Sequence, residues 1–351
     1  MPAPEPGPGP GAADAAEPVP SGRRRALRRL AGDRAAVAGL VVVGLFVVAA
    51  VAAPLLSPAD PVKVDFLHRF ASPTPAHPLG TDNLGRDELS RILFGARLSI
   101  GMAVAATTGI SVMGLLMGLV AGAYGPVAGA VIMRVVDVLL ALPTLILALV
   151  VVGLLGQSLR TLIVTLALVG WPNYARIVRG MTLSIREREF VEAARAAGAS
   201  RRRIVARHVA PNLVGPLVVL STLDLGRVLL AVSGLSFLGF GVAPPTPEWG
   251  AMLSEAKAYL DRAPQLMVWP GLAITILVLS FNLAGDGIRD LLDPRLVEGA
   301  TAVGGGRRGG GRQRRVLSAV GGTGAAATLP AGPGLGSATF GPGPGGPQAS
   351  A

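Results

Sequence analysis

The sequence predicts an all-α integral membrane protein with about six transmembrane helices, and three observations lead to this fold class. Of the 351 residues, 51% are hydrophobic and only 15% are charged, whereas a soluble chain carries about 25% charged residues. The mean hydropathy is +0.56. Several apolar segments also reach the length of about 20 residues that a helix needs to cross a bilayer. The chain is therefore expected to lie in a membrane.

The first apolar segment, residues 35–56, is long enough to cross the membrane. The arginines that precede it are Arg23, Arg24, Arg25, Arg28, Arg29 and Arg34. By the positive-inside rule, this charge places the N-terminus in the cytoplasm. A cleaved signal peptide is the alternative, but the apolar run is too long, so we expect a retained anchor. Residues 1–34 are predicted to form a disordered cytoplasmic tail, because residues 1–22 lack apolar periodicity.

An extracytoplasmic segment, residues 57–97, is predicted to separate this anchor from a five-helix core, residues 98–290. The core spans are expected at Leu98–Ala121, Ala128–Leu155, Leu159–Ile177, Leu213–Leu235 and Leu266–Leu283. Six crossings return the C-terminus to the cytoplasm, where residues 291–351 are expected to form a mostly disordered tail. The loop at residues 176–211 holds nine arginines, whereas the outer loop Gly241–Gln265 has only Lys257 and Arg262 as basic residues. The charge bias agrees with this topology.

Composition also limits the chemistry. The chain has no cysteine, which excludes disulfides and thiolate ligands, and His68, His77 and His208 are too far apart to form a metal cluster unaided. We therefore expect no metal and no cofactor. The formal net charge of +11 comes almost wholly from arginine. Basic residues beside apolar spans usually contact lipid headgroups or set topology, so membrane lipids are expected partners and nucleic acid is not.

A glycine recurs every four residues in the second predicted span, at Gly114, Gly118 and Gly122. Such a face lets another helix approach closely in lipid, where small-residue packing replaces the hydrophobic drive. The alternative is that these glycines are merely tolerated in a membrane helix. We predict a helix-packing surface.

Two pairs of opposite charge lie inside predicted spans: Asp224 with Arg227, and Arg134 with Asp137. The members of each pair are three residues apart, so they can share one helix face and neutralise one another. Charges within a membrane are costly and usually face a cavity or a partner. Each pair is thus either an internally satisfied structural pair or part of a transport pathway. Asp224 and Arg227 are the pathway candidates.

The loop at residues 176–211 is patterned as two short helices joined at a glycine. Ile185–Ala197 contains good helix formers, Gly198 suits the left-handed end of a helix, and Ser200 is a natural N-cap for a second helix that runs to His208. The alanines leave a thin helix that can enter a groove, and Glu192 and Arg195 offer charged contacts at its rim. This pattern predicts a surface on which another protein docks.

Three consecutive arginines, Arg201, Arg202 and Arg203, fall in the first turn of the second helix, where the helix dipole disfavours cations. Local helix stability therefore does not explain them. Lipid phosphates or an acidic partner surface would explain them, and a solvated charge run that only sets topology is the alternative.

The pattern Glu192-Ala193-Ala194, then Gly198, then Pro211 resembles the EAA loop of inner-membrane subunits of binding-protein-dependent ABC transporters. His208 is similar to the dipeptide and oligopeptide branch, and Ala210 is a mild departure. In the family this loop is a coupling helix that sits in a cleft of the ATPase subunit. The resemblance implies the following docking residues: Glu192, Ala193, Ala194, Arg195, Gly198 and Ser200.

Three further segments resemble the C-type permease subunit of the same branch, and together the resemblance covers about residues 30–297. They are residues 77–91, 235–250 and 282–295. The resemblance implies the permease fold of type I ABC importers, a second permease subunit in a heterodimer, two ATP-binding cassette ATPase subunits and an extracytoplasmic solute-binding protein. It also implies the inner membrane of a bacterium, with both termini in the cytoplasm.

Residues 77–91 are expected to form a structural collar outside the membrane. Gly80 and Gly85 suit turns, Asp82 can cap a helix, and Arg86 with Asp87 can clamp the segment against a helix end. A calcium site is the alternative, since Asp82, Asn83, Asp87 and Glu88 offer oxygen ligands, but their spacing is not that of an EF-hand.

A proline-rich loop follows the fifth predicted span and contains Trp249. With Trp249 at headgroup level, this loop is expected either to form part of the surface where a solute-binding protein docks or to act as an ordinary interfacial anchor.

No catalytic residue is assigned. The only lysines are Lys63 and Lys257, and neither follows a glycine, so the Gly-Lys-Ser/Thr end of a phosphate-binding P-loop is absent. The chain is expected to be a non-catalytic permease that forms the pathway for dipeptides or oligopeptides; nickel chelates and glutathione-like peptides remain open as solutes. The alternative is an ion-gradient-driven secondary transporter, for which Asp224 is the only candidate carboxylate at the midplane.

Overall fold

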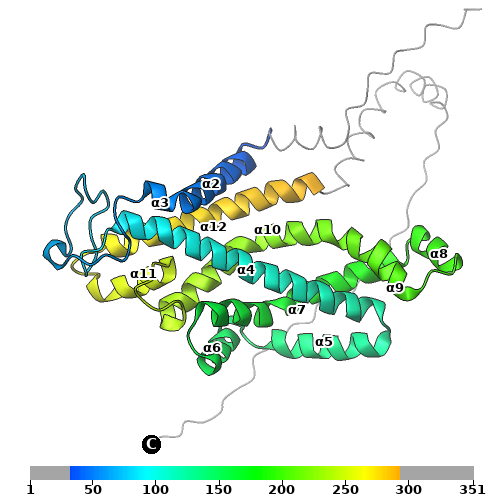
Figure 1. Cartoon of the computed structure of the whole chain (residues 1–351). Coiled ribbons are helices and arrows are strands. Elements are labelled where there is room, and N and C mark those ends of the chain that lie inside the picture. The colour runs from blue at the N-terminus through cyan, green and yellow to red at the C-terminus, as the bar shows by residue number, and fades with distance from the viewer. Residues whose placement is uncertain (1–31, 293–351) are drawn as a thin grey trace, which may run out of the picture. The chain divides into compact units, whose positions relative to one another are not determined.

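The computed structural model describes residues 32–292, and the regular structure in this part of the chain consists of helices and one isolated bridge between Thr81 and Asp87. The α-helices shown in Figure 1 are α2 (Arg34–Val51), α3 (Ala53–Leu56), α4 (Glu88–Ala123), α5 (Pro126–Ala141), α6 (Thr144–Leu155), α7 (Leu159–Arg186), α8 (Glu189–Ala196), α9 (Arg201–Ile204), α10 (Ala210–Leu235), α11 (Trp249–Ala256) and α12 (Gln265–Leu292). The predicted tails, residues 1–34 and 291–351, lie almost wholly outside the described residues.

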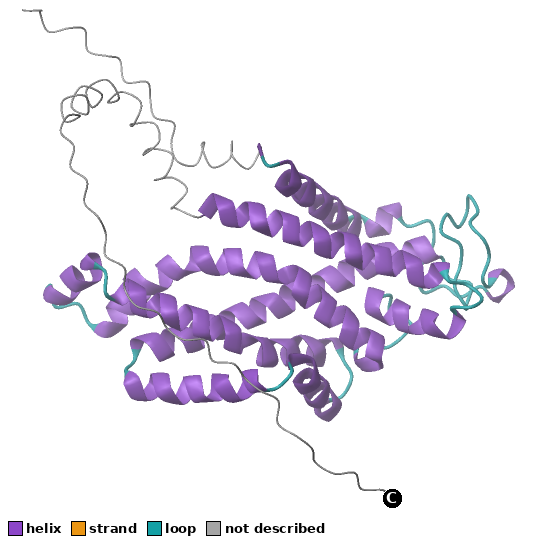
Figure 2. Cartoon of the chain, turned by 180° about the vertical axis from the view of Figure 1, so that it is seen from behind, coloured by secondary structure: helices purple, strands orange, loops and turns teal. Residues whose placement is uncertain are grey.

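The all-α membrane class is confirmed. Five helices are long and apolar enough to cross a bilayer: α2, α4, α7, the continuous helix Arg201–Phe240 and α12. A sixth crossing is present if α5 and α6 together count as one bent span. Helices α8 and α9, which are joined at Gly198, form a hairpin. This hairpin and the segment between α3 and α4 lie at opposite ends of the long helices in both views (Figure 1 and Figure 2).

The predicted span Ala128–Leu155 is not a single straight helix. It divides into α5 and α6, which meet at an angle of 96°. The break falls at Leu142, whose backbone is extended (φ −97°, ψ 140°) because the following residue is Pro143. The sequence contained this signal, but the unbroken hydropathy of the segment concealed it.

Helix α4 begins at Glu88, ten residues before the predicted span. Its 36 residues correspond to a length of about 54 Å, which exceeds the thickness of a bilayer with its headgroups. Asp87 caps the helix by accepting a hydrogen bond from the Ser90 amide. Helix α4 is therefore longer than a membrane crossing requires, and its first turns support the segment at residues 57–87.

The glycine-rich face of α4 packs against α7, as predicted. Gly114, Gly118 and Gly122 lie against Tyr174, Val178 and Thr182, respectively. These two helices form the most extensive contact between any two described elements. The close approach is possible because the glycines have no side chain at the interface.

Trp249 is not an interfacial anchor, and it does not lie on a docking surface. It is fully buried at the start of α11, donates a hydrogen bond from Nε1 to the Ile92 carbonyl oxygen, and contacts the Phe46 ring edge to face. Gly95 of α4 provides the space for its indole. The prediction for Trp249 was wrong because tertiary packing places α11 against α4 and α2, and docking of a solute-binding protein on the rest of this loop stays a prediction.

Candidate functional site

The predicted hairpin is present, but its first helix is shorter than expected. Helix α7 runs on to Arg186 and a break at residues 187–188 separates it from α8, so the predicted helix Ile185–Ala197 is wrong at its start. Its end is as predicted: Gly198 has a φ of +78°. The amides of Gly198 and Ala199 donate to the carbonyls of Arg195 and Ala194, which together form a Schellman cap.

The second helix of the hairpin does not stop at His208, contrary to the prediction. The chain stays helical from Arg201 to Leu238, and the kink near the end of this helix falls at Gly239 (φ +89°). A π-helical turn at Val205–Val209 accommodates Pro211, which has no amide to donate. The Asn212 side chain donates to the His208 carbonyl oxygen at 2.6 Å. The helix that starts at the Ser200 N-cap is therefore continuous with the fifth predicted span.

The hairpin has a buried inner face and an exposed outer face. Val191, Ile204 and Val209 are buried in the same apolar cluster as the spans, so the hairpin is packed onto the bundle. Most of the expected docking residues are exposed: Glu192, Ala193, Arg195, Gly198 and Ser200. Ala194 is half-buried and packs against the cluster. The outer face thus presents small and charged side chains on a fixed support.

Asp224 and Arg227 pair on one face of α10, as their spacing predicts. The Arg227 guanidinium donates to both carboxylate oxygens, at 2.7 and 3.0 Å. Asp224 also accepts a hydrogen bond from the Tyr174 hydroxyl at 3.1 Å. The Asp224 side chain is 11% exposed, whereas that of Arg227 is 64% exposed. The carboxylate is thus buried in the protein while the guanidinium faces outward.

Two hydroxyl groups complete this polar cluster. The Ser111 and Ser221 hydroxyls lie 2.6 Å apart and join α4 to α10. The sequence analysis missed Tyr174 and both serines, because their positions on three different helices give no local signal. Their common feature is only that each is a polar residue within an apolar span.

The second predicted pair, Arg134 with Asp137, does not form. Asp137 instead pairs with Arg176 of α7 at 2.7 Å, and both Arg134 and Asp137 are exposed. Packing of α5 against α7 brings a nearer guanidinium to the carboxylate.

A cavity of about 540 Å³ lies beside the exposed face of Arg227. Its walls are mainly apolar residues from α4, α6, α7, α10 and the turn that follows α10, and Asn173 and Thr144 add polar groups. A mostly apolar cavity with a few convergent polar groups is typical of a small-molecule binding site. Of the pair, Arg227 lines this cavity and Asp224 does not.

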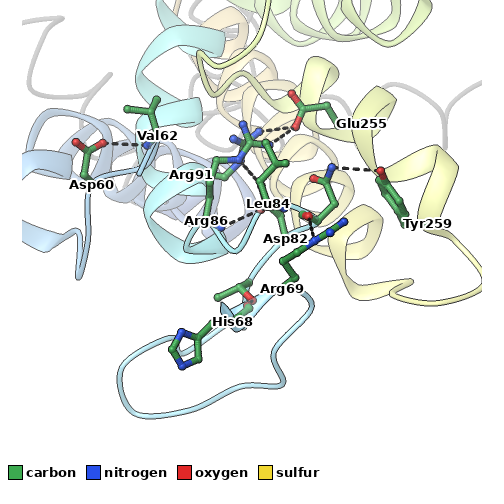
Figure 3. A network of polar contacts seen from close by, with 12 residues as sticks. Asp60, Val62, His68, Arg69, Asp82, Leu84, Arg86, Arg91, Glu255 and Tyr259 are labelled. Carbon is green, nitrogen blue, oxygen red and sulfur yellow. Dashed lines mark hydrogen bonds and ion pairs between the residues drawn. The ribbon is translucent and has the colours of Figure 1, made fainter. Parts of the chain in front are cut away.

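The collar at the other end of the bundle is an ion-pair network (Figure 3). Arg86 donates to Asp82 and Glu255, each at 2.6 Å, and Arg91 also donates to Glu255, at 2.9 Å. Both arginine side chains are 2% exposed. The network ties the segment before α4 to α11, so the expectation of a structural collar agrees with this arrangement.

Details of the collar differ from the sequence analysis. The cap of helix α4 is Asp87 and not Asp82, and Arg86 holds the segment through Asp82 and Glu255. Gly80 and Gly85 have φ values of +81° and +76°, as turns require. Glu255 was missed because it lies 169 residues from Arg86.

Two of the four oxygen ligands that the calcium alternative requires, Asp82 and Asp87, are engaged within the protein, whereas Glu88 Oε1 is buried without a hydrogen-bond partner. Asp82 accepts from Arg86, and Asp87 accepts from Ser90 and lies 2.9 Å from His77 Nδ1. Across residues 32–292, no group of three or more His, Cys, Asp or Glu side chains has the geometry of a metal site.

Comparison with known proteins identifies the family of this chain. Residues 114–298, which include the hairpin and the Asp224–Arg227 pair, match the family described as binding-protein-dependent transport system inner membrane component. The chain belongs to this family. Residues 21–73 of the permease match the N-terminal transmembrane domain of oligopeptide transport permease C. The permease is therefore a transmembrane subunit of an ABC importer, as its motifs predict, and this membership argues against the ion-gradient-driven alternative.

Curated relatives cover most of the permease. The dipeptide transport system permease protein DppC of Alkalihalophilus pseudofirmus is 39% identical over 273 residues, or 78% of this chain and 90% of the relative. The nickel transport system permease protein NikC of Escherichia coli K12 is 43% identical over 258 residues (74% and 93%). The glutathione transport system permease protein GsiD of Pectobacterium atrosepticum is 41% identical over 270 residues (77% and 90%).

Among solved structures, an inward-facing form of the MetNI methionine ABC transporter matches with a TM-score of 0.48 and 21% identity. The match covers 58% of the permease and 97% of that chain.

Proposed function

We propose that this importer subunit docks an ATPase subunit through the outer face of its hairpin and carries peptides past Asp224 and Arg227. The docking residues are those that the sequence predicts: Glu192, Ala193, Ala194, Arg195, Gly198 and Ser200. The hairpin end of the bundle lies in the cytoplasm, in keeping with its nine arginines. Both termini are cytoplasmic, and the collar lies on the outer side of the inner membrane.

One observation carries this proposal: the hairpin and the pathway candidates belong to one helix. The continuous helix from Arg201 to Phe240 contains both the second arm of the hairpin and Asp224. Ser200 and Asp224 are separated by about 36 Å along this axis. Because the hairpin arm and the pair share one helix that packs against α4 and α12, a displacement of the hairpin by its partner is transmitted along this helix toward Asp224 and Arg227.

The transporter requires further subunits in this scheme. A second permease subunit completes the pathway as a heterodimer, two ATPase subunits bind and hydrolyse ATP, and a solute-binding protein delivers solute at the collar end. The permease itself is non-catalytic. ATP binding draws the hairpins together and opens the pathway outward, and hydrolysis resets the cycle.

Peptides are the proposed solutes. Two lines of similarity favour them: the match to the oligopeptide permease family at residues 21–73 and the relatedness to DppC. The cavity beside Arg227 suits a peptide, because it combines apolar walls for side chains with a guanidinium and the amide of Asn173. Nickel and glutathione systems contain similar permeases, so these solutes serve as competitors in the test.

The test compares ATP-dependent peptide uptake and ATPase activity in sealed vesicles that contain the full transporter. We expect Glu192→Lys to abolish uptake while ATPase subunits either dissociate or hydrolyse ATP without transport. Asp261→Lys is the matched control, because Asp261 is equally exposed but lies in the connection between α11 and α12, away from the hairpin. Normal uptake by Glu192→Lys would contradict docking through this face, and uptake driven by an ion gradient without ATP would contradict the whole scheme.

A further inference from the structure

A cavity beneath the hairpin is lined by three arginines. It has a volume of about 330 Å³ and is bounded by Arg186 at the end of α7, Arg195 of α8 and Arg201 of α9. The other lining residues, Ala123, Ala199, Ile204 and Val205, are uncharged. No carboxylate lines the cavity, so its electrostatic potential is positive.

The three guanidinium groups are not neutralised by the protein. Within residues 32–292, no carboxylate approaches any of them within ion-pair distance. Arg186 donates to the Gly122 carbonyl oxygen at 2.6 Å, and Arg201 stacks on the Tyr124 ring at 5.6 Å. These contacts fix the positions of two guanidinium groups but leave their charge unpaired.

Interactions with helix dipoles explain the positions of two of the three arginines but not of the third. Arg186 and Arg195 lie in the last turns of α7 and α8, where cations are favourable. Arg201 lies in the first turn of its helix, where a cation is unfavourable. The position of Arg201 is therefore not explained by its own helix.

We propose that this cavity binds a phosphate group, and that the phosphate belongs to an anionic phospholipid. Guanidinium groups bind phosphate oxygens through short, charge-assisted hydrogen bonds. The volume equals that of about ten water molecules, which is sufficient for a phosphate with its glycerol.

The surroundings of the cavity favour a lipid over a soluble anion. Tyr124 lies beside Arg201, and tyrosine is enriched at the depth of the headgroups. Exposed apolar side chains lie about one turn away on the adjoining helices, at Val120 and Leu183, and Val127 follows Tyr124 in the chain. A headgroup in the cavity thus has an apolar surface next to it for its acyl chains. The bound lipid fastens the hairpin to the ends of α4 and α7.

The test is native mass spectrometry of the assembled transporter with added lipid. Phosphatidylglycerol and phosphatidylcholine with the same acyl chains are compared for the wild type, Arg195→Gln and Arg201→Gln. We expect the wild type to retain phosphatidylglycerol selectively and each substitution to weaken its binding about fivefold. Arg202→Gln and Arg207→Gln are matched controls, since both arginines are exposed on the same helix but do not line the cavity, and they leave binding unchanged.

Inorganic phosphate is the probe for a soluble source. If phosphate alone protects the wild type against thermal unfolding, and the protection is lost in Arg195→Gln, the site is a phosphate site filled from solution. Equal phosphatidylglycerol binding by the wild type and both cavity variants, or equal losses in the control variants, overturns the proposal. Arg201→Gln is the decisive variant, because Arg201 is not among the proposed ATPase-docking residues and, within residues 32–292, its side chain makes a ring contact with Tyr124 but no hydrogen bond or ion pair. The proposal does not rest on ATPase docking, since lipid binding is measured without nucleotide or transport.

Discussion

Gly118 of α4 lies directly against Val178 of α7: a Cβ added to the glycine would come within 2.6 Å of the valine Cβ. This approach is closer than real side chains tolerate, so the two helices depend on the absent methyl group.

Replacing Gly118 with isoleucine is expected to separate α4 from α7 and destabilise the protein by about 1–3 kcal/mol. Thermal unfolding in detergent measures the effect. Gly101→Ile is the matched control, because Gly101 lies on the same helix with no atom within 4 Å of an added Cβ. Equal melting temperatures for the two variants would show that the glycine face is not a packing surface.

Gly198→Val is expected to impair coupling, whereas Gly198→Asn retains it. No atom lies within 4 Å of an added Cβ at this position, so the difference arises from the φ of +78° and not from steric contact. A left-handed backbone costs an ordinary residue about 1–2 kcal/mol, and asparagine tolerates it better than valine does. The ratio of uptake to ATP hydrolysis measures coupling, and identical ratios for the two variants would refute this account.

The Asp224–Arg227 pair is expected to respond asymmetrically to substitution. Arg227→Gln leaves a carboxylate that is 11% exposed with Tyr174 as its hydrogen-bond partner, whereas Asp224→Asn leaves a guanidinium that is 64% exposed. An unpaired buried charge is the more costly of the two. Thermal unfolding should therefore show a larger loss for Arg227→Gln, with a coupling energy of at least about 0.5 kcal/mol in the double-mutant cycle.

The exposed Asp137–Arg176 pair provides the comparison for this cycle. Both of its side chains are more than half exposed, so its coupling energy is expected to be smaller. A larger coupling at Asp137–Arg176 than at Asp224–Arg227 would contradict the burial argument.

Glu248 is expected to make stability depend on pH. It caps α11, lies outside the membrane-spanning segments and accepts hydrogen bonds from Gly250, Ala251 and Ser99. Burial raises its pKa above the ordinary value of 4.5, although these hydrogen bonds oppose the shift. The folded state binds the Glu248 proton more tightly than the unfolded state does, so protonation of Glu248 stabilises the fold. This stabilisation is present below the ordinary pKa of 4.5 and is lost as pH rises through the raised pKa.

Thermal unfolding of the wild type and Glu248→Gln across about pH 4 to pH 8 checks this prediction. The melting temperature of the glutamine variant should fall less with rising pH than that of the wild type. Parallel curves for the two proteins would show that Glu248 does not titrate differently on folding.

The local features of the hairpin could be predicted because short-range chemistry fixes them. Gly198 is left-handed and Ser200 caps the next helix, since both properties depend on neighbouring backbone groups. The continuation of that helix through Pro211 could not be predicted, because a π-helical turn at Val205–Val209 accommodates the residue without an amide.

By itself, the sequence determined the membrane class, the approximate spans, the glycine face of α4 and the Asp224–Arg227 pair, because each follows from hydropathy or from spacing along one helix. Only the tertiary structure decided that Asp137 pairs with Arg176, that Trp249 is buried and that Glu255 binds Arg86. These contacts join residues that are distant in sequence. Their partners are chosen by how the helices pack against one another, and no local pattern carries that information.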